Sequence, residues 1–323
     1  MQEKIQVTQP YKRLDTYLSH HLKIPKNQAL QLIKNSQISL NHAICNKGGK
    51  ELKTGDLIKI TFLENQKKDH TKKSIDFDIE ILYEDEDILL LNKPSNLIIH
   101  SAPSHQEITL VDWLQSKNFS LSNLSGKERY GIIHRLDKDT TGAILVAKNN
   151  TSHQHLSLQL KNRSMGRYYL ALISPVLKET MDIECYLGRN PKNRLKISKL
   201  DPKKFPSARY SKSIFTPLLT NENKKIQLIM AQLFTGRTHQ IRAHLESVSR
   251  HIIGDKTYGY EGDFKGRLQL HAFFIYFIHP KSQKKMLFKA PIFNDMLECL
   301  QYFFSQDSID AVLQSSSPLF CAS

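Results

Sequence analysis

The sequence predicts an α+β protein with a small basic N-terminal domain and a larger domain built on a mixed, largely antiparallel sheet. Beyond residue 75, segments patterned as strands outnumber helical ones and show no regular strand–helix alternation. Residues 1–73 contain 14 Lys and Arg against 6 Asp and Glu. The stretch from about residue 64 to residue 74 has almost no apolar side chain, which is typical of a linker. A domain boundary is therefore expected at this linker.

Length and composition exclude several classes of protein. The chain has 323 residues, of which 40% are apolar and 24% are charged, as in a globular protein of two domains. The longest apolar runs, 143–147 and 273–278, are too short to cross a bilayer, and no signal peptide is recognisable at the N-terminus. The four cysteines stand far apart, so neither a disulfide framework nor a zinc site is indicated. A cytosolic location is expected.

The net charge of +15 is concentrated in two segments, 1–73 and 189–212. The second segment has nine basic residues and one acidic residue, Asp201. A basic surface favours nucleic acid, because neutralising phosphates releases condensed counterions. Solvated lysine-rich faces and an anionic membrane are the alternatives, although neither segment has the apolar face of an interfacial helix. We expect 189–212 to form a loop or hairpin at the rim of a cleft.

Local patterns predict the individual elements. In the small domain, apolar spacing and turn residues predict two helices and then two strands, over 13–22, 25–34, 37–44 and 57–62. The large domain, 75–304, is expected to contain helices over 110–114 and 152–160, and strands over 88–92, 132–133, 143–147, 168–173, 226–234 and 268–278. Residues 305–323 contain no Lys or Arg and include Ser-Ser-Ser-Pro, so a poorly ordered tail is expected there.

The densest cluster of polar side chains is Gly131-Ile-Ile-His-Arg-Leu-Asp-Lys-Asp-Thr-Thr-Gly142. It lies between two predicted strands, and catalytic residues are often found in loops on a rigid scaffold. From these residues alone, a surface turn with one ion pair is an equally good interpretation.

Two further clusters bear on function. In Gly236-Arg-Thr-His-Gln-Ile-Arg-Ala-His244 the histidines are five residues apart, not the four that place two ligands on one helix face, so we discount a metal site. Its two arginines could face phosphate or keep a carboxylate ionised. In Arg167-Tyr-Tyr-Leu-Ala171, one tyrosine is expected in the core and the other as a stacking platform for a base.

Together these motifs resemble those of the RluA/RluD-type RNA pseudouridine synthases. The segment His134-Arg-Leu-Asp137 with Thr140-Thr-Gly142 is similar to the family's catalytic motif, and the other two clusters are similar to its tyrosine and arginine motifs. Further resemblances follow in family order, over 83–100, 254–258 and 270–280. The first 73 residues resemble the S4 RNA-binding domain that many members have.

The resemblance implies an isomerase that converts uridines in RNA to pseudouridine without a cofactor or a metal. It implies that Asp137 is the catalytic carboxylate beside the ribose, either as nucleophile or as base, and that Arg242 opposes its protonation on burial. Tyr169 is implied to lie against the uracil and to handle the proton that leaves its carbon, above an apolar floor at Leu270. A paired uridine must be everted, and Arg135 is implied to occupy the vacated space. Other substrate contacts are expected from His134 and Arg237.

The resemblance suggests large-subunit (23S) ribosomal RNA as the substrate, with transfer RNA as the second choice. No membrane partner is expected, and nothing in the sequence implies an oligomer. Two other classes are weighed against the enzyme. Asp137-Lys-Asp-Thr140 matches the DxDxT pattern of haloacid-dehalogenase phosphatases, although His134 and Arg135 interrupt the apolar strand that normally precedes it. An RNA-binding or ribosome-assembly factor without catalysis is the other alternative, and it would not need Asp137.

Overall fold

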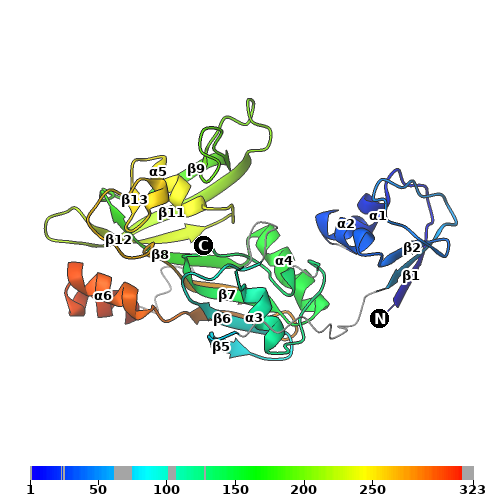
Figure 1. Ribbon diagram of the computed structural model, residues 1–323, viewed down its shortest axis with the longest axis horizontal. Helices are drawn as coiled ribbons and strands as arrows, with labels where there is room; N and C mark the ends of the chain where they lie inside the picture. The colour runs from blue at the N-terminus through cyan, green and yellow to red at the C-terminus, as the bar shows by residue number, and fades with distance from the viewer. Residues whose placement is uncertain are drawn as a thin grey trace.

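The computed structural model describes residues 2–22, 24, 26–61, 75–100, 107–126 and 129–314 (Figure 1). The expected linker, 64–74, and the last part of the expected tail, 315–323, lie outside these residues. Within the described residues the chain forms a four-stranded sheet near the N-terminus and an eleven-stranded sheet beyond it. Over the same residues, none of the helices has the length and apolar character needed to span a bilayer.

The N-terminal sheet is antiparallel, and its strands in spatial order are β1 (Gln2–Gln6), β4 (Leu57–Thr61), β2 (Ile38–Leu40) and β3 (Ala43–Ile44). Both expected helices are present, as α1 (Leu14–His21) and α2 (Lys26–Lys34). Their apolar faces pack on the sheet in one core that includes Leu14, Leu18, Ile33, Ile58 and Ile60.

The single strand expected over 37–44 is wrong, because the chain reverses inside it to make the β2–β3 hairpin. Asn41 and His42 form the turn, with φ values of 50° and 72°. Two successive positive φ values are what a tight two-residue hairpin turn requires. The Asn41 side chain donates to Asp56 and accepts the backbone N–H of Leu57, at 2.8 and 2.9 Å. Ile38, Leu40 and Ile44 all lie at even positions, so the apolar spacing on the two sides of the turn does not reveal it.

The large sheet confirms the predicted mixed, largely antiparallel class. Only β7 and β14 pair in parallel, at His271↔Thr141 and Ala272↔Gly142, among the described strands. The main path runs β10-β9-β11-β12-β8-β14-β7-β6-β5, and β13 and β15 pair at its side with β8 and β14. The strands are β5 (Glu80–Glu84), β6 (Ile88–Lys93), β7 (Thr141–Ala147), β8 (Gly166–Ser174), β9 (Met181–Arg189), β10 (Ile197–Lys199), β11 (Arg209–Thr220), β12 (Gln227–Leu233), β13 (His251–Ile252), β14 (Leu270–Ile278) and β15 (Lys285–Lys289).

Helices cover both faces of this sheet. On one face, α3 (Leu110–Ser116) and α5 (Gln240–Glu246) pack on alternate residues of the central strands. On the other face lie α4 (Asn150–Asn162), α6 (Asn294–Phe303) and α7 (Gln306–Gln314). A short 3₁₀ helix, η2 (Lys256–Tyr258), follows β13. Strand alternation places Tyr169 in the first core and Tyr168 in the second.

Two further expectations are wrong. Ile132 and Ile133 do not form a strand, since Ile132 makes only an isolated bridge to Val146. Residues 306–314 are helical rather than poorly ordered, because Ile309 is fully buried and the neighbouring Val312 packs in the same core, one turn further along α7.

The N-terminal unit meets the rest of the chain beside α4, as Figure 1 shows. The Gln28 side chain donates to the Ser125 hydroxyl at 3.1 Å, and the Gln154 side chain donates to the carbonyl of Leu22 at 3.2 Å. These contacts bring α2 to one end of the cleft described below.

Candidate active site

The predicted site residues share one cleft of about 620 Å³. Its walls come mainly from the segment 129–140, one side of α4, the first half of β8 and the segment 233–242. All seven predicted catalytic and substrate-binding residues line it: His134, Arg135, Asp137, Tyr169, Arg237, Arg242 and Leu270. A larger hollow beside α6 contains none of them.

The loop that bears Asp137 is held in place by Lys93, a residue to which the sequence analysis assigned no role. The Lys93 ammonium is fully buried and donates to the carbonyls of Pro94, Leu97 and Lys138, at 2.7, 2.9 and 3.0 Å. Burial lowers its pKa to about 7, although Asp139 and Asp137 act in the opposite direction. The available signal was a lysine close behind the apolar run 88–91, at the end of a strand that is expected to be buried. A lysine is tolerated in such a place only where fixed hydrogen bonds satisfy its ammonium group.

The other end of the loop is fixed by close backbone packing. Gly142 has φ of 108°, and a Cβ there would lie 2.3 Å from the carbonyl oxygen of Ala272. Next to it, the Thr141 hydroxyl donates to Nδ1 of His271 at 2.8 Å, while Nε2 of that ring donates to the carbonyl of Ala290 at 3.2 Å. The loop is therefore followed at once by the residues of β7 that pair in parallel with β14. This pairing brings Asp137 and Leu270 to the same cleft.

Arg242 is held by Asp255 more closely than by Asp137. Its Nε and Nη2 donate to the two oxygens of Asp255, both at 2.7 Å, and that carboxylate is 1% exposed. Its Nη1 lies 3.8 Å from Oδ2 of Asp137, which is too long for a hydrogen bond. The expected pairing of Arg242 with Asp137 is thus a charge contact, made by a guanidinium whose position is set by Asp255 and by the ring of Tyr258, 4.6 Å away.

His239, which the sequence analysis considered only as a metal ligand, is a second neighbour of Asp137. Its Nε2 lies 3.9 Å from Oδ2 of Asp137, and its Nδ1 lies 3.0 Å from the Tyr258 hydroxyl. Burial lowers the pKa of His239, with Asp137 opposing, so the ring is neutral at neutral pH. The Tyr258 hydroxyl also accepts the backbone N–H of Ile197 at 2.7 Å.

That contact links the site to the basic segment 189–212. The expected hairpin is present, made by β9 and β10, and it lies against α5 and Tyr258. Of this fully described segment, no residue is among those that line the cleft. The hairpin therefore packs against α5, which carries part of the arginine motif 236–244, and does not form part of the cleft wall.

Three predicted substrate contacts differ in exposure. Arg135 and Arg237 are exposed at the cleft, and Nε of Arg237 donates to the carbonyl of Tyr210 at 3.0 Å. His134 is buried, and its Nε2 accepts the backbone N–H of Leu145 at 3.1 Å. Burial, with a smaller effect of Arg167, lowers the pKa of His134 to about 3. The ring is neutral and anchors the start of the loop to β7.

Tyr169 and Leu270 form the apolar part of the cleft and are 4% and 3% exposed. Burial raises the pKa of Tyr169, while the charge of Arg167 opposes this shift. The phenol is therefore protonated at neutral pH. The expectation that one tyrosine of the pair lies in the core is met by Tyr168, on the opposite face of β8.

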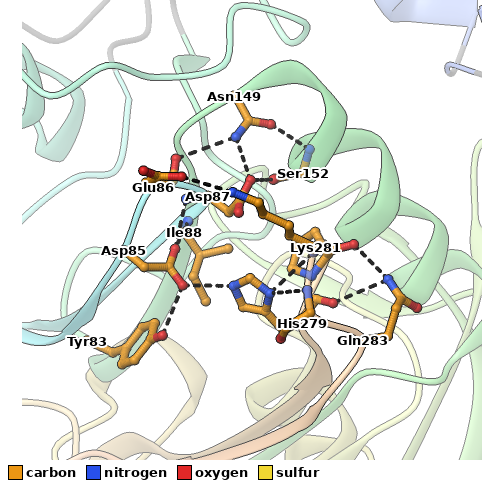
Figure 2. A network of polar contacts seen from close by, with 12 residues as sticks. Tyr83, Asp85, Glu86, Asp87, Ile88, Asn149, Ser152, His279, Lys281 and Gln283 are labelled. Carbon is orange, nitrogen blue, oxygen red and sulfur yellow. Dashed lines mark hydrogen bonds and ion pairs between the residues drawn. The ribbon is translucent and has the colours of Figure 1, made fainter.

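A group of metal-ligand type lies elsewhere, at Asp85, Asp87 and His279 (Figure 2). Nδ1 of His279 accepts the backbone N–H groups of Lys281 and Ser282, and its Nε2 donates to Asp85 at 2.8 Å. Asp87 accepts from the side chains at the start of α4, namely Asn149 and Ser152. These intramolecular hydrogen bonds tie the β5–β6 turn to α4 and to the β14–β15 turn, so the group acts as a structural network.

Comparison with known sequences matches both parts of the chain. The family model described as RNA pseudouridylate synthase matches residues 87–247, and the S4 domain model matches residues 12–58. A Helicobacter pylori (strain J99) protein named as an uncharacterized RNA pseudouridine synthase is 53% identical over 313 residues, which cover 96% of this chain and 95% of the relative.

The chain belongs to the RNA pseudouridine synthase family.

More distant relatives of the synthase agree with this assignment. Ribosomal large subunit pseudouridine synthase D of Pseudomonas aeruginosa is 33% identical over 238 residues, which cover 69% of this chain and 71% of that protein. The solved structure of human RNA pseudouridylate synthase domain containing 1 has a TM-score of 0.56 at 22% identity, covering 74% of this chain and 96% of its own. That structural likeness supports the fold. The synthase is therefore an isomerase that converts uridine in RNA to pseudouridine.

The phosphatase alternative is wrong for this family. The segment before Asp137 is not the buried strand that a DxDxT motif normally ends, and Asp139 is exposed and outside the cleft lining.

Proposed function

We propose that the synthase isomerises specific uridines of large-subunit ribosomal RNA, with Asp137 as the catalytic carboxylate. The supporting observation is the setting of Asp137, whose side chain is 17% exposed in a cleft that also contains a phenol and an apolar floor. The carboxylate has a guanidinium at 3.8 Å and a neutral imidazole at 3.9 Å. Either role of the residue requires a carboxylate beside the ribose.

The reaction breaks the bond between N1 of uracil and C1′ of ribose, turns the base and rejoins it through C5. Asp137 acts at the ribose, as a nucleophile on C1′ or as a base that removes a ribose proton. Tyr169 lies against the ring and takes part in moving the C5 proton, and Leu270 supports the ring from the other strand. Arg242 provides the cation, and Asp255 keeps it in position.

The uridine reaches this cleft by leaving its helix, at an unstacking cost of a few kcal/mol. Arg135 is exposed at the mouth of the cleft and is suited to occupy the place of the everted base. Arg237, exposed on the opposite wall, is suited to contact phosphate, which positions RNA without reading its sequence.

Large-subunit ribosomal RNA is favoured as the substrate for two reasons. The chain has an S4 match at residues 12–58, and a relative that covers 69% of it is named for the large ribosomal subunit. Transfer RNA is the second choice. The cytosolic location expected from the sequence belongs to the same proposal.

The test is to map pseudouridines in ribosomal and transfer RNA of a strain that lacks the gene, and then to restore Asp137→Asn or the unchanged chain. We expect one or more large-subunit positions to lose pseudouridine, to regain it with the unchanged chain and to stay unmodified with the variant. Purified Asp137→Asn should bind the same RNA as tightly as the unchanged protein.

Asp139→Asn is the matched control, because Asp139 is exposed on the same loop and lies outside the cleft lining. It should restore modification. Lost sites in transfer RNA alone would overturn the ribosomal assignment, and full activity of Asp137→Asn would overturn the catalytic one.

A further inference from the structure

Among the described residues, one buried cation in the cleft has no counter-ion. Arg167 on β8 is 8% exposed, and its Nε has no hydrogen-bond partner in the part of the chain that the structure describes. Two other guanidinium groups of low exposure are paired: Arg242 binds Asp255, and Arg267 binds Asp295, each through two donors. Burying an unpaired charge is strongly unfavourable, so the site of Arg167 is incomplete in the free protein.

The guanidinium is directed into the cleft. Arg167 and Tyr169 are two residues apart on β8, so their side chains leave the same face of the sheet, and both line the cleft. The group extends as far as the opposite wall, because a Cβ on Gly236 would lie 2.8 Å from its Nη1. The absence of a side chain at Gly236 therefore leaves room for this cation.

The proposed reaction creates an anion at this place. When the bond between C1′ and N1 breaks, its electron pair stays on the base, and the negative charge spreads over N1, O2 and O4 of the uracil. This holds whether Asp137 attacks C1′ or removes a ribose proton. As the bond from C5 to C1′ then forms, Asp137 either leaves C1′ or returns the proton that it took from the ribose. The C5 proton leaves and N1 gains a proton, so the product is an isomer of the substrate.

We propose that Arg167 is a further catalytic residue, which donates hydrogen bonds to the carbonyl oxygens of the displaced uracil anion. The inference rests on the proposed function of the cleft. A preformed donor aimed at developing charge in a site shielded from water is among the strongest contributions to catalysis. The uracil anion is the counter-ion that completes the site of Arg167.

The test uses full-length Arg167→Met and Arg167→Lys with RNA from the strain that lacks the gene. With enzyme in excess, Arg167→Met should lower the single-turnover rate by about 10²–10³-fold at saturating RNA. Arg167→Lys keeps the charge and should recover much of this loss. The dissociation constant of the RNA should be unchanged in both variants.

The unfolding temperature distinguishes a catalytic role of Arg167 from a structural one. Removing an unpaired buried charge should leave the unfolding temperature of Arg167→Met equal to that of the unchanged protein or higher. Arg267→Met is the matched control, because Arg267 is paired with Asp295 and lies outside the cleft lining. It should lower the unfolding temperature and leave the single-turnover rate close to normal.

A second substrate tests the step itself. In an RNA fragment with 5-fluorouridine at the mapped position, fluorine stabilises the departing anion, so the deficit of Arg167→Met in glycosidic cleavage should shrink. A normal rate for Arg167→Met, a loss confined to RNA affinity, or an equal deficit with both bases would each overturn the inference. An inactive unchanged protein would instead contradict the proposed function.

Discussion

Gly142 is a single residue on which the geometry of the catalytic loop depends. Its φ of 108° is unfavourable for any other residue, and the space for a side chain is filled by the backbone of β14. The close approach allows β7 and β14 to pair in parallel at the point where the loop ends. A side chain at this position should therefore destabilise the protein in two ways, through backbone strain and through a clash with the backbone of β14.

We predict that Gly142→Ala lowers the free energy of unfolding by more than about 3 kcal/mol, since neither backbone can move without breaking the sheet. Gly259→Ala is the control in the same unit, with φ of 86° but with only the His251 side chain nearby, at 3.3 Å. Its loss should be about 1–2 kcal/mol, from backbone strain alone. Urea unfolding of both variants measures the difference, and equal losses would contradict the clash.

Lys93 is the second residue with an effect beyond its own position. We predict that Lys93→Met lowers kcat by about 10²-fold, because the carbonyl of Lys138 loses its donor and the Asp137 loop is no longer held in register. RNA affinity should be retained, since Lys93 is fully buried and cannot contact RNA. Steady-state rates with separate RNA-binding measurements test this, and a loss confined to KM would argue against a positioning role.

Site residues were predictable as a set, but their contacts were not. The resemblance of the motifs to those of the family indicated seven residues, and all seven line the cleft. The choice of Asp255 as the main partner of Arg242 depends on how η2 folds back on α5, which no spacing in the sequence reveals. The same is true of His239, whose approach to Asp137 follows from its φ of 51° at the start of α5.

At the scale of elements, long apolar patterns predicted strands and helices correctly, whereas short patterns did not. β6 and α4 follow from a buried run and from helical spacing, and both are present. The β2–β3 reversal and the isolated bridge at Ile132 are set by turn and edge geometry, to which alternation of apolar residues is insensitive. α7 was missed because its few apolar residues are stabilised by packing in the same core as α6 rather than by helix propensity.

The β9–β10 hairpin and the chain that follows it form the basic element nearest to the arginine motif. We predict that the double variant Lys203→Ala with Lys204→Ala weakens RNA binding and makes its salt slope shallower by up to about 2, one unit for each phosphate that is no longer neutralised. Both side chains are exposed. Binding isotherms at several salt concentrations provide the measurement.

The matched control is Lys224→Ala with Lys225→Ala, on the exposed β11–β12 turn. That pair removes the same charge and should change affinity only weakly. If the two double variants behaved alike, the effect would come from net charge and not from a docking element.

For the whole molecule, buried neutral histidines set the response to acid. Burial lowers the pKa of His271 to about 4, and His134, His153 and His244 are lowered similarly for the same reason. In the unfolded chain these rings bind protons near pH 6.5, so the unfolded state binds more protons over the interval between the two values. Stability is thus fully present above pH 6.5 and is lost as pH falls toward 4.

We predict that His271→Gln has a shallower loss of stability over this interval than the unchanged protein. The contribution of one such ring is on the order of 3 kcal/mol by pH 4. Chemical denaturation at a series of pH values measures the slope. A variant slope as steep as that of the unchanged chain would mean that His271 does not contribute.

The small contact between the N-terminal unit and the rest of the chain has a consequence for how RNA is held. The hydrogen bonds of Gln28 and Gln154 across it join polar side chains to a hydroxyl and a carbonyl, and such contacts supply little binding energy in water. An RNA that occupies both units gains avidity instead, because the covalent tether gives the second unit a high effective concentration once the first is bound. The synthase should therefore favour an RNA whose docking helix and target uridine can contact the two units at the same time.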